Sequence, residues 1–259
     1  WLTTRGIEFI EARDEKPWLC HLSYIKPHWP YLVPSPYHKL YCSSDLPPVN
    51  RSDDERLSDH PLLKVWMDMR VCKSFSRNEV RDTVGPAYMG LIKEIDDQMG
   101  RLFDYLEQAG RMDDTMIVFS SDHGENLGNR GLWGKSVMYE DSVAVPLILV
   151  GPDIPKNIVC GTPVSLIDIY PTICKAMGKT LYYSSQEARR ARAGERRACS
   201  AGSSPNLPLV LPALRCVLTP SGHAASRVQR LHQRSVCLLV DFGVLTVLMT
   251  LVASPGKRK

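Results

Sequence analysis

Four side chains in this sequence combine reactive chemistry with unusual surroundings, and three of them share one short stretch. Asp122, His123 and Lys135 belong to FSSDHGENLGNRGLWGK, residues 119–135, which overlaps the apolar run TMIVF. A carboxylate beside a neutral imidazole can ligate one divalent cation, Ca²⁺, Mg²⁺ or Mn²⁺, and the imidazole favours Mn²⁺. A lysine ammonium suits an anionic oxygen of sulfate or phosphate. The stretch is thus a candidate metal and oxyanion site, although such a pair is also typical of a surface turn.

The fourth side chain is His28, in the proline-rich segment KPHWPY. An imidazole held in such a loop can donate a proton to a leaving oxygen. A histidine that packs against Trp29 and Tyr31 explains the local sequence equally well. His28 is therefore a candidate general acid with an open structural alternative.

Apolar patterns predict the elements that must position these side chains. Strands are predicted at 17–25, 115–120 and 145–151, and amphipathic helices at 85–110 and 166–178. In the first helix, Pro86 fits the first turn and Gly110 fits the C-terminal cap. Alternating strands and helices predict an α/β fold with helices on the faces of a sheet. Ligands of such sheets bind at the carboxyl ends of strands, where both candidate segments begin.

Charge divides the chain into two unlike parts. The 259 residues carry a net charge of +4, but residues 180–259 contain 12 Lys and Arg against 3 Asp and Glu. We predict a catalytic-type domain at 1–179 and a basic tail of low order at 180–259, because the tail has no periodic buried face. A frameshifted read, a mis-joined exon and an isoform tail all remain open as origins of the tail.

Composition argues against several other classes of function. The eight cysteines form no C-x-x-C pair, so a zinc ribbon or a thioredoxin-type site is unsupported. The apolar run 236–254 approaches the length of a membrane span, but Asp241 interrupts it at a cost of about 3 kcal/mol. The tail arginines lack interleaved aromatic residues, which argues against nucleic acid. Since residue 1 is Trp, we expect the natural N-terminus to lie upstream, and localisation stays open.

Four segments, in their order and spacing, resemble the sulfatase branch of the alkaline phosphatase-like hydrolases. They are SYIKPHWPY, YMGLIKEIDDQMGRL, IVFSSDHGENLGNRGLWGKSVMYEDSVAVPLILVGPDI and VSLIDIYPTICKAMG, and the likeness spans about residues 1–178. The Asp-His pair, in place of Asp-Asn, looks like choline-sulfatase-like and phosphonate monoester hydrolase-like members. The resemblance implies a sandwich of helices around a mixed, mostly parallel sheet that is incomplete at its N-terminus.

The resemblance also implies roles for the candidate residues. Asp122 and His123 would bind one divalent metal ion, Lys135 would bind the sulfuryl or phosphoryl oxygens, and His28 would hydrogen-bond the ester and assist the leaving group. Family members use a formylglycine nucleophile made from a C/S-x-P-x-R motif. No such motif occurs in these 259 residues, and the nearest string, SSPNL at 203–207, ends in Leu. We therefore expect this chain alone to lack esterase activity.

Three functions follow from these observations. The leading hypothesis is a metal-dependent hydrolase of sulfate monoesters, with a small anionic ester as its partner. Hydrolysis of phosphonate monoesters or phosphodiesters is the alternative, since one site serves both. A third reading is a non-catalytic relic of the fold. Neither a nucleic acid nor a membrane is expected as a partner, and a homo-oligomer is left open.

Overall fold

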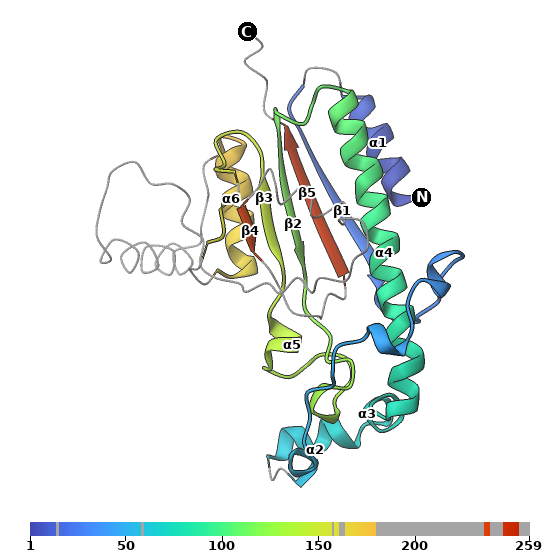
Figure 1. The fold of residues 1–259 in the computed structure, drawn as a ribbon. Coiled ribbons are helices and arrows are strands. Elements are labelled where there is room, and N and C mark those ends of the chain that lie inside the picture. Colours follow the sequence, from blue (N-terminus) through green and yellow to red (C-terminus); the bar gives the residue numbers. More distant parts are fainter. Residues whose placement is uncertain are drawn as a thin grey trace, which may run out of the picture.

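A five-stranded sheet forms the centre of the protein, and helices cover both of its faces (Figure 1). The computed structural model describes residues 1–13, 16–57, 60–156, 158–160, 164–179, 236–238 and 246–253. The strands are β1 (Trp18–Pro27), β2 (Thr115–Ser121), β3 (Leu147–Val150), β4 (Val236–Leu238) and β5 (Thr246–Ala253). Their order across the sheet is β1-β5-β2-β3-β4. The predicted α/β class is confirmed, as are the three predicted strands.

Two apolar cores attach the helices to the sheet. Helices α1 (Leu2–Glu11) and α4 (Asn78–Gln108) pack on one face, through buried residues such as Ile10, Leu102 and Met249. Helix α6 (Ile169–Ala176) packs on the other face, against Val118 and Leu149. Every residue of β2 is buried, because β2 lies inside the sheet and is covered on both faces. This two-sided burial explains the continuous apolar run TMIVF that precedes the candidate site.

The direction of the strands differs from the sequence-based expectation. All four hydrogen-bonded strand pairs in the described residues are antiparallel, so the predicted mostly parallel pairing is wrong for these strands. One reason is β5, which lies between β1 and β2 and runs opposite to both. The other reason is the connection from β2 to β3. It stays near the edge where β2 ends and contains only short elements, a single turn at Asn129–Gly131 and the helix α5 (Glu140–Val143), so β3 must return antiparallel.

The positions of β1 and β2 matter most for the candidate site. Both strands are antiparallel to β5, so they run in the same direction and their carboxyl ends lie at the same edge of the sheet. His28 directly follows β1, and Asp122 directly follows β2. The sheet therefore brings together two segments that are far apart in the sequence, as the strand pattern predicts.

The long helix α4 differs from its prediction at one end. It begins at Asn78 rather than at residue 85, so Pro86 lies inside the helix and not in its first turn. A proline inside a helix removes one backbone hydrogen bond, yet α4 continues through Pro86, and Tyr88 two positions later is fully buried. The other end is as predicted. Gly110 has φ +64°, and the N–H of Arg111 donates to the carbonyl of Leu106 at 2.8 Å.

Two segments of the region 180–259 join the sheet. The prediction of low order is wrong for β4 and β5, and β5 contributes the buried side chains Met249 and Leu251 to the main core. The rest of that region, including most of 180–245, lies outside the described residues. Helix α1 was also not predicted. Its central Gly6 lets it approach the side chain of Leu22 in β1, where an added Cβ would lie 3.0 Å from two methyl groups.

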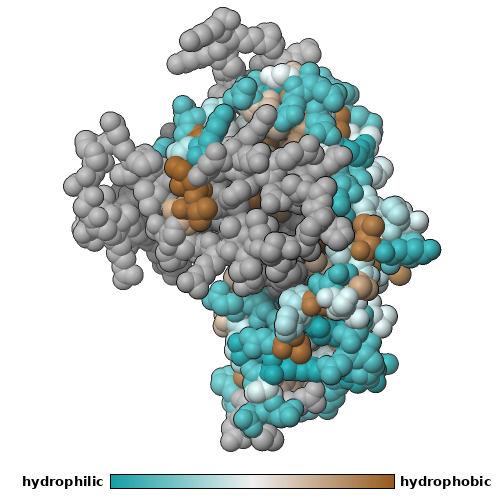
Figure 2. Space-filling model, in the orientation of Figure 1, coloured by the Kyte–Doolittle hydropathy of each residue, from teal (hydrophilic) through white to brown (hydrophobic). Residues whose placement is uncertain are grey.

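Short elements build a lobe beyond the carboxyl edge of β1 and β2. They include helices α2 (Pro61–Asp68) and α3 (Arg70–Phe75) and the single turns η1 (Tyr37–Lys39), η2 (Ser43–Asp45), η3 (Asp53–Leu57) and η4 (Asn129–Gly131); η5 (Leu166–Asp168) leads into α6. Figure 2 shows that the described surface on this side is mainly hydrophilic, with small separate hydrophobic patches. No helix within the described ranges is long and apolar enough to cross a membrane.

Candidate functional site

The structure places His28 and Lys135 in contact, although 107 positions separate them in the sequence. The Nζ atom of Lys135 lies 3.5 Å from Nε2 of His28. Nδ1 of His28 lies 2.7 Å from the carbonyl oxygen of Trp29. Because a carbonyl only accepts, Nδ1 carries the hydrogen, and Nε2 of the neutral ring is then the acceptor that faces Lys135.

Local hydrogen bonds hold the loop that carries His28. The ammonium of Lys26 donates to the carbonyl of Pro30 at 2.5 Å and to that of His28 at 3.3 Å. The backbone N–H of His28 donates to the carbonyl of Ile25 at 3.0 Å. The indole of Trp29 lies beside the His28 ring, with 5.6 Å between ring centroids. Both interpretations of His28 therefore keep some support. Its ring packs against Trp29, and its Nε2 atom faces Lys135.

Asp122 and His123 form a second polar pair at the end of β2. Nε2 of His123 lies 3.5 Å from Oδ2 of Asp122, and Nδ1 of His123 lies 2.8 Å from the carbonyl of Gly124. Nδ1 is therefore the donor, and Nε2 is the ring nitrogen that lies beside the carboxylate. The Asp122 side chain is 41% exposed and that of His123 is 23% exposed. The hydroxyl of Ser121 fixes the turn by donating to the carbonyl of His123 at 2.9 Å.

This donor set fits part of the coordination shell of one divalent cation. A carboxylate oxygen and an imidazole nitrogen lie side by side, and the second ring nitrogen is held by a carbonyl as in many metal-binding histidines. Within the described ranges, no group of three or more His, Cys, Asp or Glu residues is close enough to hold a metal ion. The pair would thus supply two ligands. We call His28, Asp122, His123 and Lys135 together the reactive edge.

Glu125 is a buried carboxyl group in the same loop, to which the sequence assigned no role. It is 1% exposed, and its Oε1 accepts hydrogen bonds from the backbone N–H groups of Gly134 and, at 3.4 Å, Leu127. Burial raises the pKa of Glu125 to about 7, while these N–H groups and the charge of Lys135 act in the opposite direction. The available signal was a second acidic residue, three positions after Asp122, inside a glycine-rich loop where turns expose backbone N–H groups.

The contact between Glu125 and Gly134 closes the loop and presents Lys135. Asn126 reinforces it, because its side-chain amide donates to the carbonyl of Gly134 and to the hydroxyl of Ser142. Gly134 has φ +82° and Ser136 has φ +95°, so left-handed backbone flanks Lys135 on both sides. A residue with a Cβ adopts such a conformation only where its surroundings impose it. We call Glu125, Asn126, Trp133 and Gly134 the loop core.

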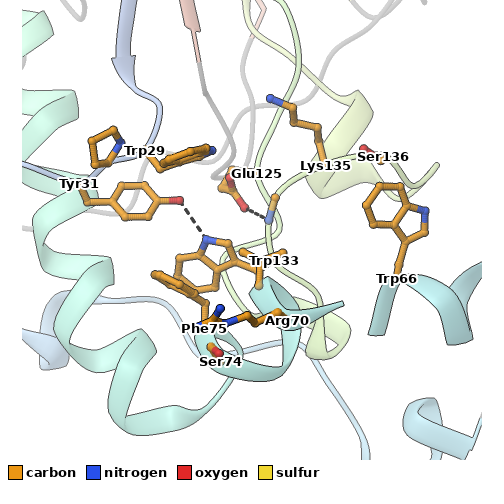
Figure 3. A pocket seen from close by; sticks show the side chains of 13 residues that line it. Trp29, Tyr31, Trp66, Arg70, Ser74, Phe75, Glu125, Trp133, Lys135 and Ser136 are labelled. Carbon is orange, nitrogen blue, oxygen red and sulfur yellow. Dashed lines mark hydrogen bonds between the residues drawn. The ribbon is translucent and has the colours of Figure 1, made fainter. Parts of the chain in front are cut away.

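Next to Lys135 lies a cavity of about 1020 Å³ with aromatic walls. Figure 3 shows its lining side chains, among them Trp29, Tyr31, Trp66, Phe75 and Trp133. The indole N–H of Trp133 donates to the hydroxyl of Tyr31 at 3.0 Å, and the Phe75 ring lies 5.2 Å from that of Trp133. The sequence did not predict this cavity, since its walls come from the His28 loop, α2, α3 and the Lys135 loop.

The fold and these pairs can now be compared with known proteins. The Sulfatase family model matches residues 2–179. The multifunctional alkaline phosphatase superfamily protein PehA of Trinickia caryophylli is 36% identical over 195 residues, which cover 69% of this chain and 37% of that protein. The choline-sulfatase of Rhizobium meliloti (strain 1021) is 33% identical over 66% of this chain and 33% of its own length.

Solved structures agree with these relatives. The phosphonate monoester hydrolase SpPMH from Silicibacter pomeroyi superposes with a TM-score of 0.66 at 29% identity, over 80% of this chain and 42% of that one. The phosphonate monoester hydrolase of Agrobacterium radiobacter gives a TM-score of 0.62 at 30% identity, over 69% of this chain and 38% of that one.

These likenesses define the class first and then the family. The fold is that of the alkaline phosphatase-like superfamily. Within it, the chain belongs to the sulfatase family, whose model matches residues 2–179. The predicted resemblance is thereby confirmed. The chain spans roughly a third of the length of the curated relatives that it matches.

Proposed function

We propose that this chain carries the metal-binding and oxyanion-binding part of a hydrolase of sulfate monoesters, and that the 259-residue chain alone is inactive. The observation that carries the proposal is the contact between Lys135 and His28, at the edge of the sheet where Asp122 and His123 also lie. Family membership supports a hydrolase. The names of two relatives, a choline-sulfatase and an arylsulfatase, support a sulfate ester as substrate.

Lys135 would bind the sulfuryl oxygens of the ester group, and His28 would bind the ester oxygen of the leaving group. The Lys135 ammonium donates to the anionic sulfuryl oxygens and stabilises the charge that they carry in the transition state. His28 in its protonated form keeps Nδ1–H on the carbonyl of Trp29 and presents Nε2–H to the ester oxygen. That proton would neutralise the leaving group as the bond to sulfur breaks.

Asp122 and His123 would hold one divalent cation, which would polarise the ester oxygens when bound. The exposed carboxylate and the acceptor nitrogen of the imidazole support this assignment. Mn²⁺ suits a mixed oxygen and nitrogen set better than Ca²⁺ or Mg²⁺ does. The formylglycine nucleophile of the family has no motif in this sequence. Inactivity of the isolated chain rests on that missing motif.

Hydrolysis of phosphonate monoesters is the second candidate. It is favoured by the two phosphonate monoester hydrolases among the solved structures, with TM-scores of 0.62 and 0.66. Sulfate monoesters and phosphonate monoesters each present a tetrahedral group with one negative charge to Lys135. Stronger binding of phenyl sulfate than of phenyl phenylphosphonate would favour the sulfate reading, and the reverse order would favour the phosphonate reading.

The proposal is tested by binding of phenyl sulfate, measured by calorimetry with Mn²⁺ present. Lys135→Gln removes the ammonium, and we expect the affinity to fall about tenfold, the usual value of a hydrogen bond to a charged group. Lys156→Gln, an exposed lysine after β3, is the matched control and should bind as the unmodified chain does. Equal affinity of the Lys135→Gln variant and the unmodified chain would refute the oxyanion role.

A second assay addresses inactivity. The chain, supplied with Mn²⁺ and an aryl sulfate, should release no detectable phenol. Turnover by the unmodified chain that disappears in Lys135→Ala would overturn the proposed inactivity. It would show that this chain does not need the formylglycine nucleophile of the family.

A further inference from the structure

The cavity beside Lys135 has the features of a preformed binding site for a flat, apolar group. Its volume of about 1020 Å³ is at the upper end of the range of small-molecule pockets. Five aromatic side chains line it, and they come from the His28 loop, α2, α3 and the Lys135 loop. Aromatic walls favour aromatic ligands, because rings gain from stacked and edge-to-face contacts in addition to burial.

The wall around Trp133 is fixed before any ligand binds. Trp133 is 5% exposed, and its backbone N–H donates to the sulfur of Cys72 in α3 at 3.3 Å. Its indole N–H donates to Tyr31, whose ring lies edge-on at 6.1 Å between centroids. Since these contacts connect α3, the His28 loop and the Lys135 loop, a ligand would lose little free energy in ordering this wall.

Two cations lie at different sides of this aromatic cavity. Figure 3 shows Lys135 on one side of Trp133 and Arg70, the first residue of α3, on the other. Lys135 contacts His28. Arg70 has no hydrogen-bond or ion-pair partner among the residues that the structure describes, whereas Lys73 in the same helix pairs with Asp68 at 2.9 Å. The guanidinium of Arg70 is therefore available to a ligand.

The carboxyl group in the lining does not serve as the partner of Arg70. Glu125 is 1% exposed, and its Oε1 is engaged by the N–H groups of Gly134 and Leu127. The charges that remain accessible at the cavity are thus the two cations.

We propose that the cavity binds the leaving group of the substrate, and that this leaving group is an aryl body with a second anionic group, which Arg70 binds. The inference rests on the proposed function, because it assumes that Lys135 holds the ester anion. Arg70 suits a carboxylate or sulfate, since its guanidinium can form two parallel hydrogen bonds with either. The substrate class is accordingly an aromatic ester with anions at both ends, and Arg70 is a specificity-determining residue.

Sulfonates test this proposal without any need for turnover, because their C–S bond resists hydrolysis. The dianionic probes are 4-carboxybenzenesulfonate and the longer 4′-carboxybiphenyl-4-sulfonate, and each is paired with the same sulfonate without its carboxylate. Trp29, Trp66 and Trp133 line the cavity, so quenching of tryptophan fluorescence reports binding. For at least one spacer length, the dianion should bind the unmodified chain about tenfold more tightly than the monoanion.

Two variants separate the inference from the proposed function. Arg70→Gln should remove the tenfold preference for the dianion and leave the affinity for the monoanion unchanged. Lys135→Gln should weaken the binding of both probes. Lys73→Gln is the matched control, because it removes a nearby positive charge from the same helix without altering the cavity lining. It should keep the preference.

Each outcome decides one of the two claims. Equal binding of monoanion and dianion at both spacer lengths, with a loss in Lys135→Gln, would refute the role of Arg70 and leave the proposed function standing. The same holds if Lys73→Gln abolishes the preference as fully as Arg70→Gln does, since the effect would then be unspecific charge. No binding of any sulfonate to the unmodified chain would refute both claims.

Discussion

Two carboxyl groups three positions apart in one loop have opposite environments. Asp122 is 41% exposed and lies beside His123, whereas Glu125 is 1% exposed and accepts hydrogen bonds from the loop backbone. The same contrast separates the reactive edge from the loop core. The side chains of Asp122 and His123 in the reactive edge are partly exposed, whereas Glu125 and Trp133 in the loop core are buried and hydrogen-bonded to other parts of the protein.

The difference in burial suggests that some residues of the loop serve binding and others hold the loop in place. Chemistry at an exposed edge needs atoms with unused donors or acceptors, such as Nε2 of His123. A functional side chain is held in a precise position only where the residues that support it are packed and hydrogen-bonded. Substitutions in the loop core should therefore lower stability, and substitutions in the reactive edge should change binding with little effect on stability.

The largest effect is expected for Trp133→Ala in the loop core. Trp133 is 5% exposed, and its loss removes a large buried ring and the hydrogen bond to Tyr31. The free energy of unfolding should fall by about 3–5 kcal/mol, as for other buried aromatic residues. Urea denaturation followed by circular dichroism measures this change. Trp29→Ala is the control, because Trp29 is 63% exposed and should cost about 0.5 kcal/mol.

If Trp133→Ala lowered the free energy of unfolding by only about 0.5 kcal/mol, the loop core would not differ in stability from the reactive edge. Trp133→Phe is a smaller change that tests the contribution of the indole N–H alone. It keeps most of the packing and removes the indole N–H, so it should cost about 1 kcal/mol, the usual value of one hydrogen bond.

The second effect is a pH dependence that originates in Glu125. Burial raises its pKa from the ordinary 4.5 to about 7 in the folded chain, so the folded state keeps a proton that the unfolded state loses. Its contribution to stability is fully present below pH 4.5 and is lost as pH rises to about 7. The total is roughly 3 kcal/mol, from 1.36 kcal/mol per pKa unit.

Glu125→Gln should remove this dependence. A glutamine still accepts the N–H of Gly134 through its side-chain oxygen, but it does not titrate in this range. Unfolding free energies of both proteins should be measured between pH 4.5 and 8 in metal-free buffer, and only the unmodified chain should show the decline that stops near pH 7. Parallel pH profiles would mean that Glu125 is not the group responsible.

Much of the site could be predicted because local sequence fixes it. The buried run before Asp122 predicts a strand end, and the prolines around His28 predict a loop at another strand end. Two strands in the same direction then bring both segments to one edge. His28 and Lys135 lie in contact, and the roles that the family resemblance implies for them stay predictions.

The rest depends on contacts that no local pattern encodes. The role of Glu125 depends on the N–H of Gly134, nine positions away, which becomes available only when the loop folds. The place of β5 depends on pairing with β1, more than 200 positions earlier in the chain, and the apolar run 236–254 does not reveal which strands it joins. The family resemblance implied a mostly parallel sheet, whereas the short connection from β2 to β3 makes these two strands antiparallel.

The smallest effect on stability is expected for His123→Ala in the reactive edge. In metal-free buffer, its free energy of unfolding should stay within about 0.5 kcal/mol of the unmodified value, because His123 is partly exposed and contacts its neighbours only locally. Mn²⁺ at ten times its dissociation constant should stabilise the unmodified chain by about 1.4 kcal/mol, through preferential binding to the folded state. His123→Ala should lose this gain, and the control His38→Ala, an exposed histidine in η1, should retain it. A gain that survives in His123→Ala would place the cation elsewhere and leave Asp122 and His123 as an ordinary turn.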